Sequence, residues 1–198
     1  MVACPATTYS YSMGAFSSSF VSPPGASANP TVLGVVGDAD LESGAFEQFL
    51  GPVQNGLATQ AIVIVGDCSY ANGNHQIWDQ WFNLQQPIFS KIPNVGINGN
   101  HEVIRSSRGF CTENCVGYLR RAATPISKAS ADALRTYYSI NVGLVHLVFQ
   151  DDYMGSSEAI GSDAWLNEGE TMLSWFKQDL SRVNRQVTPY VVVVKHNP

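Results

Sequence analysis

The sequence has few charged residues and no long apolar run. Charged side chains make up 14% of its 198 residues, and the formal net charge is −5. Without an excess of basic residues the chain lacks the electrostatic footprint of nucleic-acid-binding proteins, so we expect no nucleic acid partner. No apolar run approaches the roughly 18 residues that a membrane-spanning helix needs, so we expect no membrane partner either.

The first residues lack the features of a targeting segment. MVACPATTYSYSMG has neither a basic start nor the apolar stretch of a secretory signal peptide. We therefore expect no signal peptide in the chain as given, and a start inside a longer protein is the alternative interpretation.

Cysteine is also scarce, but two of the four cysteines are close together. Cys111 and Cys115 occur in the polar stretch GFCTENC. A short disulfide loop in a secreted protein is favoured over two free thiols, and a zinc site would need a second pair of ligands nearby. Cys68 follows an apolar run and is expected to be a small buried residue.

The N-terminal part differs in composition from the rest. Residues 1–30 are rich in Ser, Pro and Gly, and the alternation around Tyr9, Tyr11 and Phe20 predicts a last strand or a hairpin, followed by a linker at 22–30. A lone hairpin is only marginally stable, so we interpret this part as the tail of a preceding domain.

From residue 31 onward, short apolar runs end in polar residues. The runs are TVLGVVGDAD, AIVIVGDCSY, NVGINGNHE, LVHLVFQDD and YVVVVKHNP. Helical patterns occur between several of them, at 43–57, at 75–89 with a break or end near Pro87, and at 165–186. Alternating strands and helices predict an α/β fold with buried, largely parallel sheets, in which ligands collect at the carboxyl ends of the strands.

Residues of metal-binding type follow four of these strands, namely Asp38, Asp67, Asn100 and His196. Each alone has an ordinary interpretation, as a helix cap, a turn residue or a satisfied histidine. Four together favour a two-metal site, in which a carboxylate bridges cations about 3.5–4 Å apart. Tyr70 fits this site, because a phenol with a free pKa near 10 is held deprotonated only by a highly charged ion such as ferric iron.

Four blocks carry a family resemblance. GDAD (37–40), GDCSY (66–70), GNHE (99–102) and VVKH (193–196) resemble, in order and spacing, the signature of the metallophosphoesterases. The GDCSY block, with its tyrosine, resembles the corresponding block of the purple acid phosphatase branch. The resemblance to this family covers nearly the whole chain. The resemblance implies an αββα sandwich of two mixed sheets flanked by helices over 31–198, incomplete at its C-terminus. It also implies that 1–30 are the tail of an N-terminal, fibronectin-like β-sandwich domain plus linker.

The resemblance further implies a binuclear centre and an acid phosphatase activity on phosphate monoesters. Asp38 and Tyr70 would bind Fe(III), Asn100 and His196 would bind a divalent metal (Zn, Mn or Fe), and Asp67 would bridge the two. The substrate would be a small phosphate ester, and the location secreted or vacuolar-lysosomal.

Neighbouring residues receive subsidiary roles. The resemblance places His101 against the phosphate, as a catalytic group for the leaving oxygen, and Glu102 as a residue that orients its neighbours. Asp40 departs from the glycine usual in the first block, and either adds to the first metal site or, as we favour, points to solvent. His75 is interpreted as unrelated to the site, and His146 as a core histidine satisfied by backbone.

The family's closing Gly-His-x-His block, which gives one histidine to each metal, does not occur before Pro198. Two other functions therefore stay open. One is a non-catalytic, metal-binding remnant, and the other is a phosphodiesterase or nucleotide hydrolase of the same fold. The sequence leaves the oligomeric state open.

Overall fold

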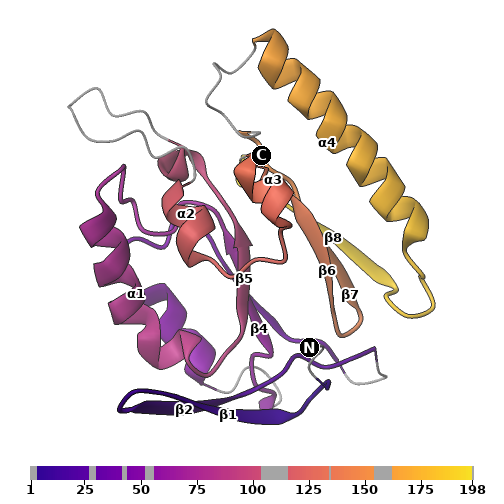
Figure 1. The fold of residues 1–198 in the computed structure, drawn as a ribbon. Coiled ribbons are helices and arrows are strands. Elements are labelled where there is room, and N and C mark those ends of the chain that lie inside the picture. Colours follow the sequence, from indigo (N-terminus) through magenta and orange to yellow (C-terminus); the bar gives the residue numbers. More distant parts are fainter. Residues whose placement is uncertain are drawn as a thin grey trace.

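The fold was analysed on a computed structural model, which describes residues 4–26, 30–41, 44–51, 56–103, 116–133, 135–153 and 162–197. Figure 1 shows four layers: helices α1 (His75–Phe89) and α2 (Val116–Arg121), a first sheet, a second sheet, and helix α4 (Asp163–Arg182) on the far side. The alternating pattern predicted the α/β class, and the sandwich architecture is the one that the family resemblance implied.

Both sheets have three strands in the part of the chain that the structure describes. The first has the order β3 (Leu33–Val36), β4 (Ala61–Val65), β5 (Asn94–Ile97), with both pairs parallel. The second has the order β6 (Tyr138–Val142), β7 (Val145–Phe149), β8 (Tyr190–Val194) and is mixed, because β6 and β7 form an antiparallel pair while β7 and β8 run parallel. The strand predictions are therefore confirmed. The second sheet is mixed, as the resemblance implied, whereas the described strands of the first sheet are all parallel.

The alternation of side chains along β4 builds two cores. Ile62 and Ile64 point to a core shared with α1, which includes the fully buried Trp78 and Trp81. Ala61 and Val63 point to the core between the sheets. A strand buried on both faces reads as a continuous apolar run, which explains why AIVIV has no polar residue.

Two helix predictions needed correction. Within the segment predicted as a helix at 43–57, Gly44–Leu50 form a 3₁₀-helix, η1, while 43 and 52–55 lie outside the described residues. Helix α1 neither breaks nor ends at Pro87, which lies inside it. Pro87 is exposed near the C-terminal end, and the carbonyl that loses its partner belongs to the exposed Asn83, where water can satisfy it.

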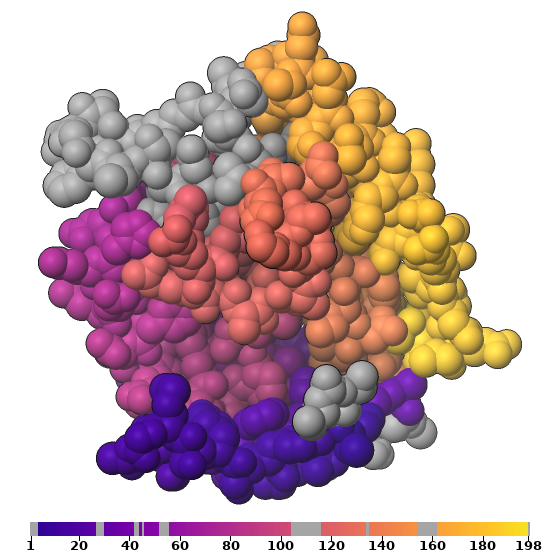
Figure 2. Space-filling view, viewed as in Figure 1, coloured from indigo at the N-terminus to yellow at the C-terminus, as the bar shows by residue number. Residues whose placement is uncertain are grey.

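The N-terminal part forms the expected hairpin, from β1 (Thr8–Met13) and β2 (Phe16–Val21), paired antiparallel. It rests on the end of α1, because Tyr11 Oη and Ser18 Oγ both donate to the carbonyl of Ser90, at 3.1 Å each. Figure 2 shows the hairpin along one edge of the molecule and α4 along another.

The remaining short helices are η3 (Asn100–Glu102) and α3 (Lys128–Asp132). Within the described ranges, no helix has the combined length and hydropathy needed to cross a bilayer.

Candidate metal centre

The predicted ligands lie where four strands end. Asp38 and Asp67 follow β3 and β4, Asn100 opens η3 after β5, and His196 follows β8. Because β3, β4 and β5 are parallel neighbours, their carboxyl ends meet at one edge of the first sheet. The hydrogen bond from His196 Nδ1 to the carbonyl of Val65, at 2.8 Å, brings the end of β8 to the same edge.

The side chains converge there. Asp38, Asp67 and His196 each offer one ligand atom, and these atoms lie within 4.8 Å of one another. Tyr70 Oη donates to Asp38 Oδ1 at 2.7 Å, and Asn100 Oδ1 lies 3.1 Å from His196 Nε2. Asp67 Oδ2 is 3.5 Å from His196 Nε2. The structure thus brings the five predicted ligands into one cluster, with Asp67 close to both pairs.

The donor set suits the expected metals. Two carboxylates and a phenol offer hard oxygen ligands, while the amide and imidazole allow a second, softer divalent ion. Residues at this edge also adopt backbone conformations that L-residues rarely use, since φ is 53° at Asp38, 48° at Asp67 and 52° at Tyr70. Such conformations cost about 1–3 kcal/mol each and cluster at functional sites.

His196 is held as a metal ligand would be. Because a carbonyl can only accept, Nδ1 donates the hydrogen bond to Val65, and Nε2 faces the oxygens of Asn100 and Asp67. Gly66 makes this approach possible. Its φ is 78°, and a Cβ there would lie 2.6 Å from His196 Nδ1.

His101 lies at the edge of the cluster. Its Nδ1 is 2.7 Å from Asn72 Oδ1, and its ring packs on Tyr70 with centroids 4.1 Å apart. Its Nε2 lies 3.8 Å from Asp67 Oδ2. Sequence reasoning did not identify Asn72; the signal was the Asn-Gly pair at 72–73, since Asn tolerates the positive φ of 51° found there.

Three groups near the cluster have shifted pKa values. Burial raises the pKa of the Glu102 carboxyl to about 7, although hydrogen bonds from backbone N–H groups oppose the shift. Burial and then the Asp38 carboxylate raise the pKa of Tyr70 above its ordinary value, so a cation would be required to deprotonate this phenol. Burial also raises the pKa of the Cys68 thiol, which is 3% exposed, as expected for a buried residue.

The other predicted residues have separate surroundings. Asp40 is exposed, and its Oδ1 accepts a hydrogen bond from Leu41 N at 2.5 Å. His75 begins α1 and lies 3.0 Å from an Arg121 nitrogen. Cys111 and Cys115 lie outside the described residues, so their predicted disulfide stays a prediction.

The interpretation of His146 was half right. It is buried, but side chains satisfy it instead of backbone, since Nδ1 lies 2.6 Å from Asn141 Oδ1 and Nε2 lies 2.8 Å from Asp179 Oδ2. In a strand, the backbone groups pair with neighbouring strands, so the ring nitrogens find partners on β6 and α4.

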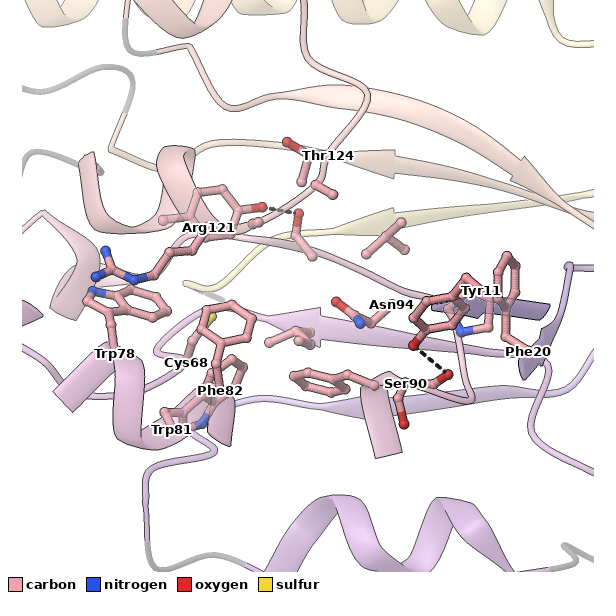
Figure 3. A pocket seen from close by; sticks show the side chains of 18 residues that line it. Tyr11, Phe20, Cys68, Trp78, Trp81, Phe82, Ser90, Asn94, Arg121 and Thr124 are labelled. Atoms are coloured by element: carbon pink, nitrogen blue, oxygen red, sulfur yellow. Dashed lines mark hydrogen bonds between the residues drawn. The ribbon is translucent and has the colours of Figure 1, made fainter. Parts of the chain in front are cut away.

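A cavity of about 490 Å³ lies elsewhere, between the hairpin, α1, β5 and α2. Figure 3 shows that aromatic side chains line it, among them Tyr11, Phe20, Trp78 and Phe82. None of the five predicted ligands lines it, so the predicted metal chemistry belongs to the strand ends.

Known proteins that are similar to this chain include purple acid phosphatases. The chain is 29% identical to purple acid phosphatase 23 of Arabidopsis thaliana, over 88% of this chain and 40% of that protein. It is 31% identical to probable inactive purple acid phosphatase 9 of the same plant, over 68% of this chain and 22% of that one. No family model matches.

Among solved structures, the fold is similar to that of purple acid phosphatase PPD1 from yellow lupin (Lupinus luteus) seeds. The TM-score is 0.66 at 17% identity, over 90% of this chain and 32% of that one. This likeness supports the sandwich architecture. The chain spans two fifths or less of the length of these relatives.

Proposed function

Because the chain belongs to the purple acid phosphatase branch of the metallophosphoesterase family, we propose that its cluster holds a binuclear metal centre that hydrolyses phosphate monoesters. The observation that carries the proposal is the convergence of five ligand-type side chains from four strand ends. Asp38 and Tyr70 would hold Fe(III), Asn100 and His196 a divalent Zn, Mn or Fe ion, and Asp67 both.

The residues of the chain prepare this site. When bound, the two metals would supply a Lewis acid and lower the pKa of water. Asp67 is buried and fixed between the two ligand pairs, so both metals would meet ligands already in place. Asp38 Oδ1 accepts a hydrogen bond from the Tyr70 hydroxyl, and this bond would have to break for Tyr70 to become a ligand.

His101 is proposed as the catalytic residue that assists the leaving group. Asn72 Oδ1 accepts from Nδ1–H, which fixes the ring orientation. Tilted packing against the Tyr70 ring limits ring rotation, so Nε2 faces the cluster beside Asp67. There the protonated ring, which carries a hydrogen on each nitrogen, would donate a hydrogen bond from Nε2 to a phosphate ester oxygen, as a preorganised group.

The wider assignments are also proposals. The hairpin of β1 and β2 would belong to the tail of an N-terminal β-sandwich domain, and 31–198 would belong to the catalytic domain. Docking of the hairpin on Ser90 supports a fixed junction between them. We propose a secreted or vacuolar-lysosomal location, supported by the family and by the closely spaced Cys111 and Cys115.

The test is hydrolysis of an aryl phosphate by the protein that contains this chain, loaded with Fe and Zn. Wild type is expected to turn over. Asp67→Asn is expected to lose at least about 100-fold in kcat/KM, because the change weakens the ligand that both metals share, and loss of a hydrogen-bond partner of a metal ligand already costs about 10–100-fold. Asp163→Asn, at the exposed start of α4, is the control and should keep full activity.

Equal activity of wild type and Asp67→Asn would contradict the proposal. A second candidate, a non-catalytic metal-binding protein, is favoured by the similarity to a relative named as inactive. Normal uptake of both metals by wild type without any turnover would select it.

A further inference from the structure

Glu102 is a buried carboxylate beside the cluster. It is 1% exposed and lies in η3, two residues after the predicted ligand Asn100. Its oxygens accept three backbone hydrogen bonds. Oε2 accepts from Asp67 N at 2.9 Å and from Gly99 N at 2.7 Å, and Oε1 accepts from Cys68 N at 3.0 Å. Both oxygens are therefore directed at backbone, which leaves the side chain as a support for the ligands and not as a ligand.

The bonds run in both directions between two loops. Glu102 comes from the loop after β5 and binds the backbone of the loop after β4. Asp67 comes from the loop after β4, and its Oδ1 accepts a hydrogen bond from the backbone N–H of His101 at 2.9 Å. The two carboxylates thus form a reciprocal clasp between the loops that carry Asp67 and Asn100.

The clasp holds a conformation that the chain would not keep by itself. Asp67 has a φ of 48°, which a non-glycine residue rarely adopts. Gly99 packs so closely that an added Cβ would collide with Asp67 Oδ1 and Asp67 N. Removing one acceptor of Glu102 would leave a buried N–H without a partner, and such groups are costly.

We propose that Glu102 is a positioning residue that sets the metal affinity of the cluster, by fixing Asp67 against Asn100 before metal binds. The inference rests on the proposed metal centre and names a further determinant of that same site. Supports of this kind orient ligands, and their loss typically lowers metal affinity 10–100-fold.

Glu102→Gln tests the role, because the amide has nearly the same shape but replaces one acceptor oxygen with a donor. The probe is Zn(II) alone, titrated against a chromophoric chelator. We expect 10–100-fold weaker binding by Glu102→Gln. The control Glu170→Gln, an exposed change on α4, should bind as wild type does.

The outcomes separate the two proposals. If wild type does not bind Zn(II), the metal centre itself is wrong. If wild type and Glu102→Gln bind equally, the centre stands and the role of Glu102 is wrong. Lower thermal stability of Glu102→Gln with unchanged Zn(II) affinity would show a structural role alone, and would also overturn the inference.

A second measurement uses only wild type, in case the variant does not fold. Amide hydrogen exchange on the metal-free protein should show the N–H groups of Asp67, Cys68 and Gly99 protected far more than exposed turn amides such as that of Gly14. Exchange of the three at the rate of Gly14 would mean that the clasp is absent before metal binds, and the proposal would fail.

Discussion

Asp38, Asp67 and Tyr70 reach the cluster from backbone conformations with positive φ. A glycine at these positions would relieve the strain, but it would remove the ligand itself. The backbone strain therefore falls on the residues whose side chains the site needs. Hydrogen bonds such as that from Asp67 N to Glu102 Oε2 offset this strain. At Gly66 the opposite holds, because only a residue without a side chain leaves room for the His196 ring.

Gly66→Ala should impair the centre. The added Cβ would lie 2.6 Å from His196 Nδ1, so His196 must move away from Asp67. We expect at least about 10-fold weaker Zn(II) binding, from the displaced ligand. Gly14→Ala is a matched control, because Gly14 also has a positive φ, of 60°, but has open space around it. Equal Zn(II) affinity of the two variants would contradict this account of Gly66.

At the scale of elements, α4 is attached to the second sheet by polar contacts. Ser139 Oγ donates to Asp179 Oδ1 at 2.6 Å, and His146 Nε2 meets Asp179 Oδ2 at 2.8 Å. Arg135 and Glu168 form a two-pronged ion pair, with Nε to Oε1 at 2.5 Å and Nη2 to Oε2 at 2.7 Å. No described residue of α4 is fully buried, so these contacts supplement a shallow apolar face.

Asp179→Ala should loosen α4. The change leaves the buried His146 ring with one partner fewer and removes the acceptor of Ser139. We expect the free energy of unfolding to fall by about 1–3 kcal/mol, the usual cost of an unsatisfied buried polar group. Urea denaturation measures it. Glu170→Ala, exposed on the same helix, should stay within about 0.5 kcal/mol of wild type. A result for Asp179→Ala within that same range would refute the role given to this contact.

Local sequence patterns predicted some elements and not others. The strands were predicted because AIVIV and YVVVV are short runs rich in β-branched residues and are followed by polar residues. The 3₁₀-helix at Gly44–Leu50 could not be predicted, because its residues fit an α-helical or a 3₁₀ period equally well. Packing on α1 decides between the two. Pro87 was misinterpreted, because tolerance of a helical proline depends on whether water reaches the freed carbonyl, and exposure is a tertiary property.

At the scale of the whole molecule, the sandwich brings together residues that are far apart in the chain. Asp38 and His196 are far apart in the sequence, yet their ligand atoms lie within 4.8 Å of each other. They meet because β3 and β8 end at the same side of the two sheets. The positions of Asp38 and His196 directly after apolar strands predicted that their side chains would meet. The contact of Asn72 with His101 and the hydrogen bonds between the loops of Glu102 and Asp67 could not be predicted from the sequence. Turn geometry decides which backbone N–H faces which acceptor.

Visible absorption of the iron-loaded protein tests the central claim most directly. If Tyr70 is a ligand of Fe(III), charge transfer from its phenolate should give a coloured band, which Tyr70→Phe should lose. Tyr190→Phe, exposed on β8, should keep the band. A Tyr70→Phe protein with the same band as wild type would show that Tyr70 does not bind iron, and would contradict the metal centre as it is assigned.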